Sequence, residues 1–132
     1  MNKIEHIGIA VKDLVQAEKT FEQLLGTSAY KKETVESEGV TTLFFKVGET
    51  KIELLQAIRE DSAIAKYIEK RGEGIHHIAF DVDSVPEKSA SLSNEGFRVL
   101  NNNVKEGADE KLINFIHPKS ANGVLVELCQ DK

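Results

Sequence analysis

Two histidines and two glutamates recur at matching places in this chain of 132 residues. The runs around His6 and His77 align residue by residue at an offset of 71 (77 − 6 = 71). The runs around Glu53 and Glu127 align at an offset of 74 (127 − 53 = 74). We interpret the chain as two copies of one unit, each with a histidine near its start and a glutamate near its end.

Two imidazoles and two carboxylates are a typical ligand set for a divalent metal ion. Imidazole suits Zn, Co, Ni or Fe, whereas carboxylate oxygen suits Mn or Mg, and two carboxylates offset the charge of the ion. Four protein ligands around an octahedral ion leave two positions for a chelating substrate, which a closed structural site lacks. Any one of these residues alone would more often be structural, but their recurrence predicts one divalent ion (Co, Zn, Ni or Mn) bound by His6, Glu53, His77 and Glu127.

Alternating patterns place each histidine on a strand. In residues 3–11 and 75–82, His6 and His77 lie on one face and larger apolar residues on the other. A helix follows each strand, capped by Asp13 or Ser84. The remaining elements are expected as strands 29–36, 40–47, 51–56, 97–100, 112–117 and 124–129, an exposed loop 101–110, and a connector helix lying on the surface within 59–73.

The order strand, helix and three strands, repeated twice, predicts an α+β fold. Two such βαβββ modules would form an eight-stranded curved sheet around a metal-binding cleft, with the helices outside. We expect one domain over residues 1–132, with module 1 at about 1–58, the connector helix at about 59–73 and module 2 at about 74–132. Parity directs all four candidate ligands into the cleft.

Composition narrows the possible partners and location. Apolar residues make up 40% and charged residues 30%, as in ordinary globular domains. A net charge of −5 argues against nucleic acid, and no apolar run reaches the roughly 18 residues of a membrane span. The single cysteine, Cys129, and the absence of a signal-peptide pattern favour the cytoplasm.

Five sequence blocks resemble the vicinal oxygen chelate superfamily, which includes glyoxalase I, extradiol dioxygenases and methylmalonyl-CoA epimerases. The resemblance is greatest to the epimerases and runs over essentially the whole chain. The run Lys-Arg-Gly-Glu-Gly-Ile-His-His and the block His-Pro-Lys-Ser favour them, since glyoxalase I more typically has Asp-Pro-Asp-Gly before its last glutamate. The blocks are Ile4–Val11, Ile52–Leu55, Lys70–Phe80, His117–Ser120 and Gly123–Leu128.

This resemblance implies metal-dependent epimerisation of methylmalonyl-CoA at C2, by removal of the proton α to the thioester and a metal-stabilised enolate. Glu127 is expected to act as one base, with Glu53 or a metal-bound water as the alternatives, and no second base is assigned. Some members carry a second acidic residue where this chain has Thr42, which cannot replace a carboxylate base. Lys119 and Ser120 are expected to contact the acyl end of the acyl-CoA substrate, and the family favours a homodimer.

Two alternatives stay open. The same four ligands would serve a glyoxalase I, which isomerises a thiohemiacetal, and some superfamily members only bind a small molecule. Among the other candidate residues, His76, Asp81 and Cys129 are interpreted as structural, and His117 as either structural or functional.

Overall fold

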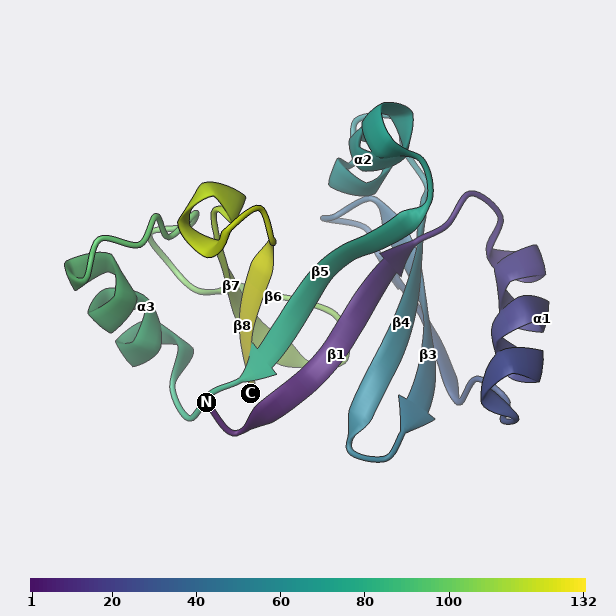
Figure 1. Cartoon of the computed structure of the whole chain (residues 1–132), viewed down its shortest axis with the longest axis horizontal. Helices are drawn as coiled ribbons and strands as arrows, with labels where there is room; N and C mark the ends of the chain where they lie inside the picture. The colour runs from purple at the N-terminus through teal and green to yellow at the C-terminus, as the bar shows by residue number, and fades with distance from the viewer. The chain divides into compact units, whose positions relative to one another are not determined.

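The computed structural model describes all 132 residues, which divide into two compact units. The His6 unit is His6–His76, and the His77 unit combines Met1–Glu5 with His77–Lys132. Eight strands and three α-helices form in the predicted order (Figure 1). In chain order they are β1 Lys3–Ala10, α1 Leu14–Leu25, β2 Lys31–Val35, β3 Val40–Val47, β4 Thr50–Ala57, α2 Ala63–Arg71, β5 Gly74–Asp81, α3 Val85–Asn94, β6 Lys105–Glu106, β7 Lys111–Ile116, the 3-10 helix η1 Pro118–Ala121 and β8 Val126–Asp131.

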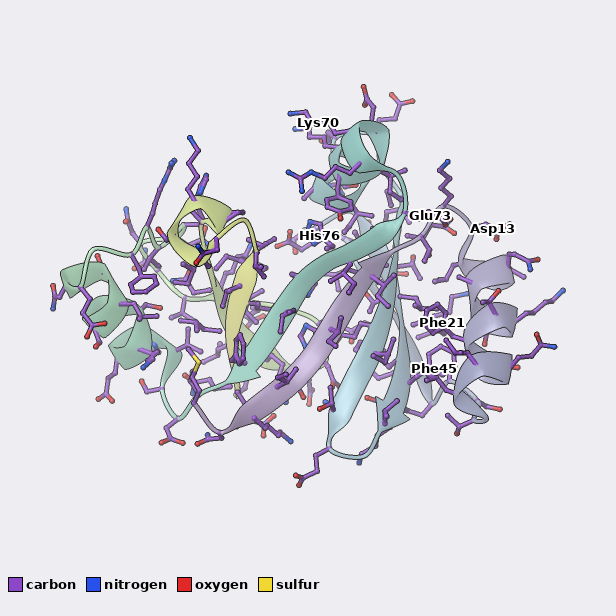
Figure 2. The ribbon with its side chains drawn as sticks, viewed as in Figure 1. Asp13, Phe21, Phe45, Lys70, Glu73 and His76 are labelled. Carbon is purple, nitrogen blue, oxygen red and sulfur yellow. The ribbon has the colours of Figure 1, made fainter.

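In the His6 unit the strands lie in the order β2-β3-β4-β1, with β1 parallel to β4 and the other pairs antiparallel. Helix α1 runs alongside β3 and β4 (Figure 1). Figure 2 shows Phe21 of α1 and Phe45 of β3 between the helix and the strands, with ring centroids 6.4 Å apart. The apolar core under α1 is built around Val11, Leu14, Leu43, Phe45 and Leu54.

Helix α2 packs one side against the sheet, and its residues other than Ile64 are exposed or partly exposed. Its buried residue Ile64 packs against Ala10 of β1 and Leu55 of β4. These two residues alternate in phase with His6 and Glu53, so α2 covers the face of the sheet that carries the candidate ligands. The physical reason is the small side chain of Ala10, which leaves room for an apolar helix face.

In the His77 unit the strands lie in the order β5-β8-β7-β6, with β5 parallel to β8. Helix α3 contacts β7 and β8, and its buried residue Val85 packs against Val82, Ile116 and Leu128. A second cluster of Ala79, Ile113 and Cys129 lies on the face that carries His77.

The fourth strand of this unit corrects one prediction. Residues 97–100 contribute only an isolated bridge between Val99 and Ile116. The strand β6, Lys105–Glu106, instead forms within the stretch expected to be a loop, and Lys105 pairs with Ile113. Residues 101–110 show no apolar alternation that would predict a strand. The strand forms because its backbone pairs with β7.

Helices α1 and α3 begin in the same way, so the internal repeat includes their first residues as well as the candidate ligands. Asp13 and Ser84 accept hydrogen bonds from the backbone N–H three residues later, each at 3.2 Å. The first backbone N–H of α1 donates to Gln56 Oε1, and that of α3 donates to Gln130 Oε1, each at 2.6 Å. These two glutamines are separated by 74 residues (130 − 56 = 74), as the two glutamates are. None of the helices has the length and hydropathy of a membrane-spanning helix.

Candidate functional site

The His6 unit brings its histidine and glutamate together. Parallel pairing of β1 with β4 places Gly8 opposite Glu53, so His6 lies two residues before the partner of Glu53. His6 Nδ1 is 3.1 Å from Glu53 Oε2. Both residues are buried, with 4% of their surface exposed.

The His77 unit repeats this arrangement. Ala79 pairs with Glu127, so His77 again lies two residues before the partner of the glutamate. His77 Nε2 is 3.4 Å from Glu127 Oε1, and both residues are buried. Each unit therefore contains one His–Glu pair built from the first and last strands of a βαβββ module, as its own sequence pattern predicts.

Each glutamate has a phenylalanine as its strand partner, and a lysine lies over the ring of that phenylalanine. The sequence analysis did not predict these residues. Phe44 pairs with Glu53, and the ammonium group of Lys31 is 5.4 Å from the Phe44 ring centroid. In the other unit Phe115 pairs with Glu127, and Lys105 is 5.5 Å from the Phe115 centroid.

The internal repeat contained a signal for these residues. The phenylalanines are 71 residues apart (115 − 44 = 71) and the lysines 74 (105 − 31 = 74). Phe115 also packs edge-on against His77, with centroids 6.2 Å apart and an interplanar angle of 87°, which orients the imidazole.

The chemistry of the donor atoms fits a divalent metal ion. Both glutamates are buried, and a buried carboxylate requires a compensating charge or hydrogen bonds. Each has an imidazole nitrogen at its side, and imidazole with carboxylate is a usual ligand combination for Zn, Co, Ni and Mn. Each unit thus holds one imidazole nitrogen and one carboxylate oxygen of the kinds that such ions bind.

Two buried charged residues, Glu5 and Lys111, lie near Cys129 in the His77 unit. Glu5 is 3% exposed, and its Oε2 is 3.9 Å from the ammonium nitrogen of Lys111. The Lys111 ammonium group also binds the carboxylate of Asp131. Burial, followed by the carboxylates of Glu127 and Glu5, raises the pKa of the Cys129 thiol far above its usual range. Cys129 is therefore a packed neutral thiol, as its interpretation as structural requires.

We expect the Cys129 thiol to resist modification in the folded protein. The thiolate is the reactive form, and this side chain is completely buried. Reaction with a disulfide reagent such as DTNB should be at least about 100-fold slower than in guanidinium-unfolded protein, because it requires local opening. Absorbance of the released thiolate measures both rates. Immediate stoichiometric reaction of the native protein would contradict this packing.

The other candidate residues occupy local structural positions. His117 Nδ1 accepts a hydrogen bond from the Lys119 backbone N–H at 3.0 Å, at the start of η1. Ser120 Oγ accepts one from the Arg98 backbone N–H at 2.9 Å. Lys119 is exposed. His76 packs edge-on against Tyr67 of α2, with centroids 5.0 Å apart.

Thr42 lies on β3 and is 1% exposed. Strand pairing places it opposite Leu55, on the same face of the His6 unit as Glu53. Its hydroxyl oxygen makes no hydrogen bond to the protein.

The sequence of this chain is similar to those of known proteins. Residues 5–115 match the profile of the Glyoxalase/Bleomycin resistance protein/Dioxygenase superfamily. The ethylmalonyl-CoA/methylmalonyl-CoA epimerase of Cereibacter sphaeroides is 39% identical over 132 residues, covering 98% of each chain. The mitochondrial methylmalonyl-CoA epimerase of Homo sapiens is 37% identical over 131 residues, covering 98% of this chain and 74% of the human protein.

A solved structure shows the same relationship. A variant of Streptomyces coelicolor methylmalonyl-CoA epimerase, in complex with 2-nitronate-propionyl-CoA, is 36% identical and superposes with a TM-score of 0.95. The match covers 99% of this chain and 95% of that one. The predicted α+β fold of two βαβββ modules, and the resemblance to methylmalonyl-CoA epimerases, are thereby confirmed. This chain belongs to the Glyoxalase/Bleomycin resistance protein/Dioxygenase superfamily.

Proposed function

We propose that this protein is an isomerase that epimerises methylmalonyl-CoA at C2. One observation carries the proposal: each unit contains a buried His–Glu pair in the same strand register, on a chain whose relatives are methylmalonyl-CoA epimerases. Similarity over nearly the whole chain supports the reaction, and the paired ligands support a metal-dependent route.

We propose further that the two pairs together bind one divalent ion, with His6, Glu53, His77 and Glu127 as its ligands. When bound, such an ion would act as a Lewis acid toward the thioester and carboxylate oxygens of the substrate. The identity of the ion among Co, Zn, Ni and Mn is a matter for metal analysis, since imidazole with carboxylate suits them all.

Glu127 is the residue we assign to proton transfer at C2. Its carboxylate is buried beside His77, within an apolar layer that includes Phe115. A carboxylate held among apolar groups can remove the α-proton from one face of C2, and inversion is completed when an acid delivers a proton to the opposite face. Thr42 has no carboxyl group and cannot act as a carboxylate base.

The remaining assignments follow the epimerase family. Exposed Lys119 offers a positive charge to the anionic acyl-CoA, and Ser120 offers a hydroxyl, as predicted for contacts to the acyl end. We propose one functional domain over residues 1–132, with the modules and connector at the predicted boundaries, acting as a homodimer. The free, buried Cys129 supports the cytoplasm as its compartment.

Deuterium incorporation at C2 of methylmalonyl-CoA tests the reaction. In D₂O, the metal-loaded protein should exchange the α-proton and interconvert the two epimers, and protein stripped by a chelator should lose this activity. Mass spectrometry follows the exchange, and a coupled assay with a stereospecific mutase follows the epimers. If no exchange occurs while methylglyoxal with a thiol turns over, the glyoxalase I alternative replaces this proposal. If neither reaction occurs but a ligand binds, the non-catalytic alternative replaces it.

A further inference from the structure

The hydroxyl of Thr42 is a buried polar group that the fold leaves without a partner. Thr42 is 1% exposed, and its Oγ1 makes no hydrogen bond to the protein. Folded proteins almost always pair buried hydroxyl groups, because an unpaired one destabilises the folded state. An exception of this kind leaves the hydroxyl available to a partner that arrives with a ligand.

Strand register places this hydroxyl on the face that carries Glu53, one of the candidate metal ligands. On β3, Phe44 pairs with Glu53 and Thr42 pairs with Leu55, the next residue on the same face. The intervening Leu43 is directed to the core under α1. Thr42 therefore lies on the ligand-bearing face of the His6 unit, one pleat along from the partner of Glu53.

The second module shows that the fold does not need a hydroxyl at this position. Ile113 is the counterpart of Thr42 (113 − 42 = 71), as His77 is of His6. Its strand partner Cys129 corresponds to Leu55 by the same repeat (129 − 55 = 74). Ile113 is buried and packs against Ala79 and Cys129. A β-branched apolar side chain thus fills the equivalent place, so the oxygen of Thr42 has no packing role.

We infer that the Thr42 hydroxyl donates a hydrogen bond to an acceptor oxygen of the bound acyl group, either the carboxylate or the thioester carbonyl. This inference rests on the proposed function. A hydroxyl can donate to either oxygen, and Thr42 lies on the ligand-bearing face of the His6 unit, one pleat from the strand partner of Glu53. Thr42 is then a substrate-binding residue, although it cannot be a base.

Thr42→Val tests this, because valine keeps the shape of the side chain and removes the oxygen. In the ligand-free protein the melting temperature should rise by about 2–6 °C, since an unpaired hydroxyl has been removed. Calorimetric titration of the metal-loaded protein with malonyl-CoA, which has the same thioester and carboxylate, should show affinity reduced about 5- to 20-fold. Thr42→Ser is the matched control and should bind within about threefold of wild type.

A second probe, propionyl-CoA, identifies the accepting oxygen, because it lacks the carboxylate. A loss with both probes assigns the thioester carbonyl, and a loss with malonyl-CoA alone assigns the carboxylate. The inference is overturned if Thr42→Val binds malonyl-CoA as wild type does in a protein that epimerises methylmalonyl-CoA. It is equally overturned if the variant melts lower than wild type, because the hydroxyl would then have a structural partner. A wild-type protein that neither epimerises nor binds malonyl-CoA would instead overturn the proposed function itself.

Discussion

His77→Ala is expected to abolish metal binding and epimerisation, whereas His76→Ala is expected to preserve both. His77 is a buried imidazole 3.4 Å from Glu127, and we propose it as a metal ligand. Removal of one of four ligands should reduce metal affinity at least about 100-fold. Epimerisation should fall by at least about 1,000-fold, because Lewis-acid assistance is lost. Metal content per chain after dialysis and the coupled epimerase assay measure the two effects.

His76 is a matched control because it is the same residue type at the neighbouring position. It points to the other side of the strand and packs against Tyr67 of α2, near which Figure 2 shows it. His76→Ala should keep its metal content and its activity within about threefold. Retention of one ion per chain by His77→Ala would rule out the proposed ligand set. Equal losses in both variants, with lower melting temperatures, would point to a damaged fold instead.

Glu127→Gln should reduce the rate of α-proton exchange even at saturating metal, where weaker metal binding no longer limits the rate. The amide keeps a carbonyl oxygen that can still bind a metal ion, but it cannot accept a proton at neutral pH. Loss of a general base lowers such rates by about 100- to 10,000-fold. Deuterium incorporation at C2, measured by mass spectrometry at saturating metal, gives the residual rate.

Glu53→Gln separates the two roles of a glutamate, because the internal repeat places Glu53 in the same register as Glu127. Both variants should bind metal more weakly. At saturating metal Glu53→Gln should recover exchange to within about tenfold of wild type, while Glu127→Gln should not. If both recover, Glu127 is only a ligand, and if neither recovers, both carboxylates take part in proton transfer.

Local patterns were sufficient to predict much of this fold. Strand alternation has a period of two, so it assigns His6 and His77 to a face without knowledge of any neighbour. Helix starts are equally local: Asp13 and Ser84 accept the hydrogen bonds that their positions predict. The pairing of Glu53 with His6 required one further step, the observation that the repeat recurs in the closing strands.

Other features depend on contacts that local patterns do not contain. β6 forms in a polar stretch because β7 offers it a partner, with Lys105 extending over Phe115. Helix α2 has an apolar stripe that fits any apolar surface, and only packing places Ile64 on Ala10. The unpaired state of the Thr42 hydroxyl also emerges only when every neighbouring donor and acceptor is positioned.

The sequence by itself determined that the chain is a duplicated βαβββ module and that each copy carries a histidine and a glutamate on one face. It could do so because strand periodicity and helix capping are properties of neighbouring residues. The tertiary structure alone decided the register that brings His6 within 3.1 Å of Glu53 and the burial of Cys129. Register and burial depend on which distant strands pair and how far they slide, and a shift of one residue would turn every side chain to the other face.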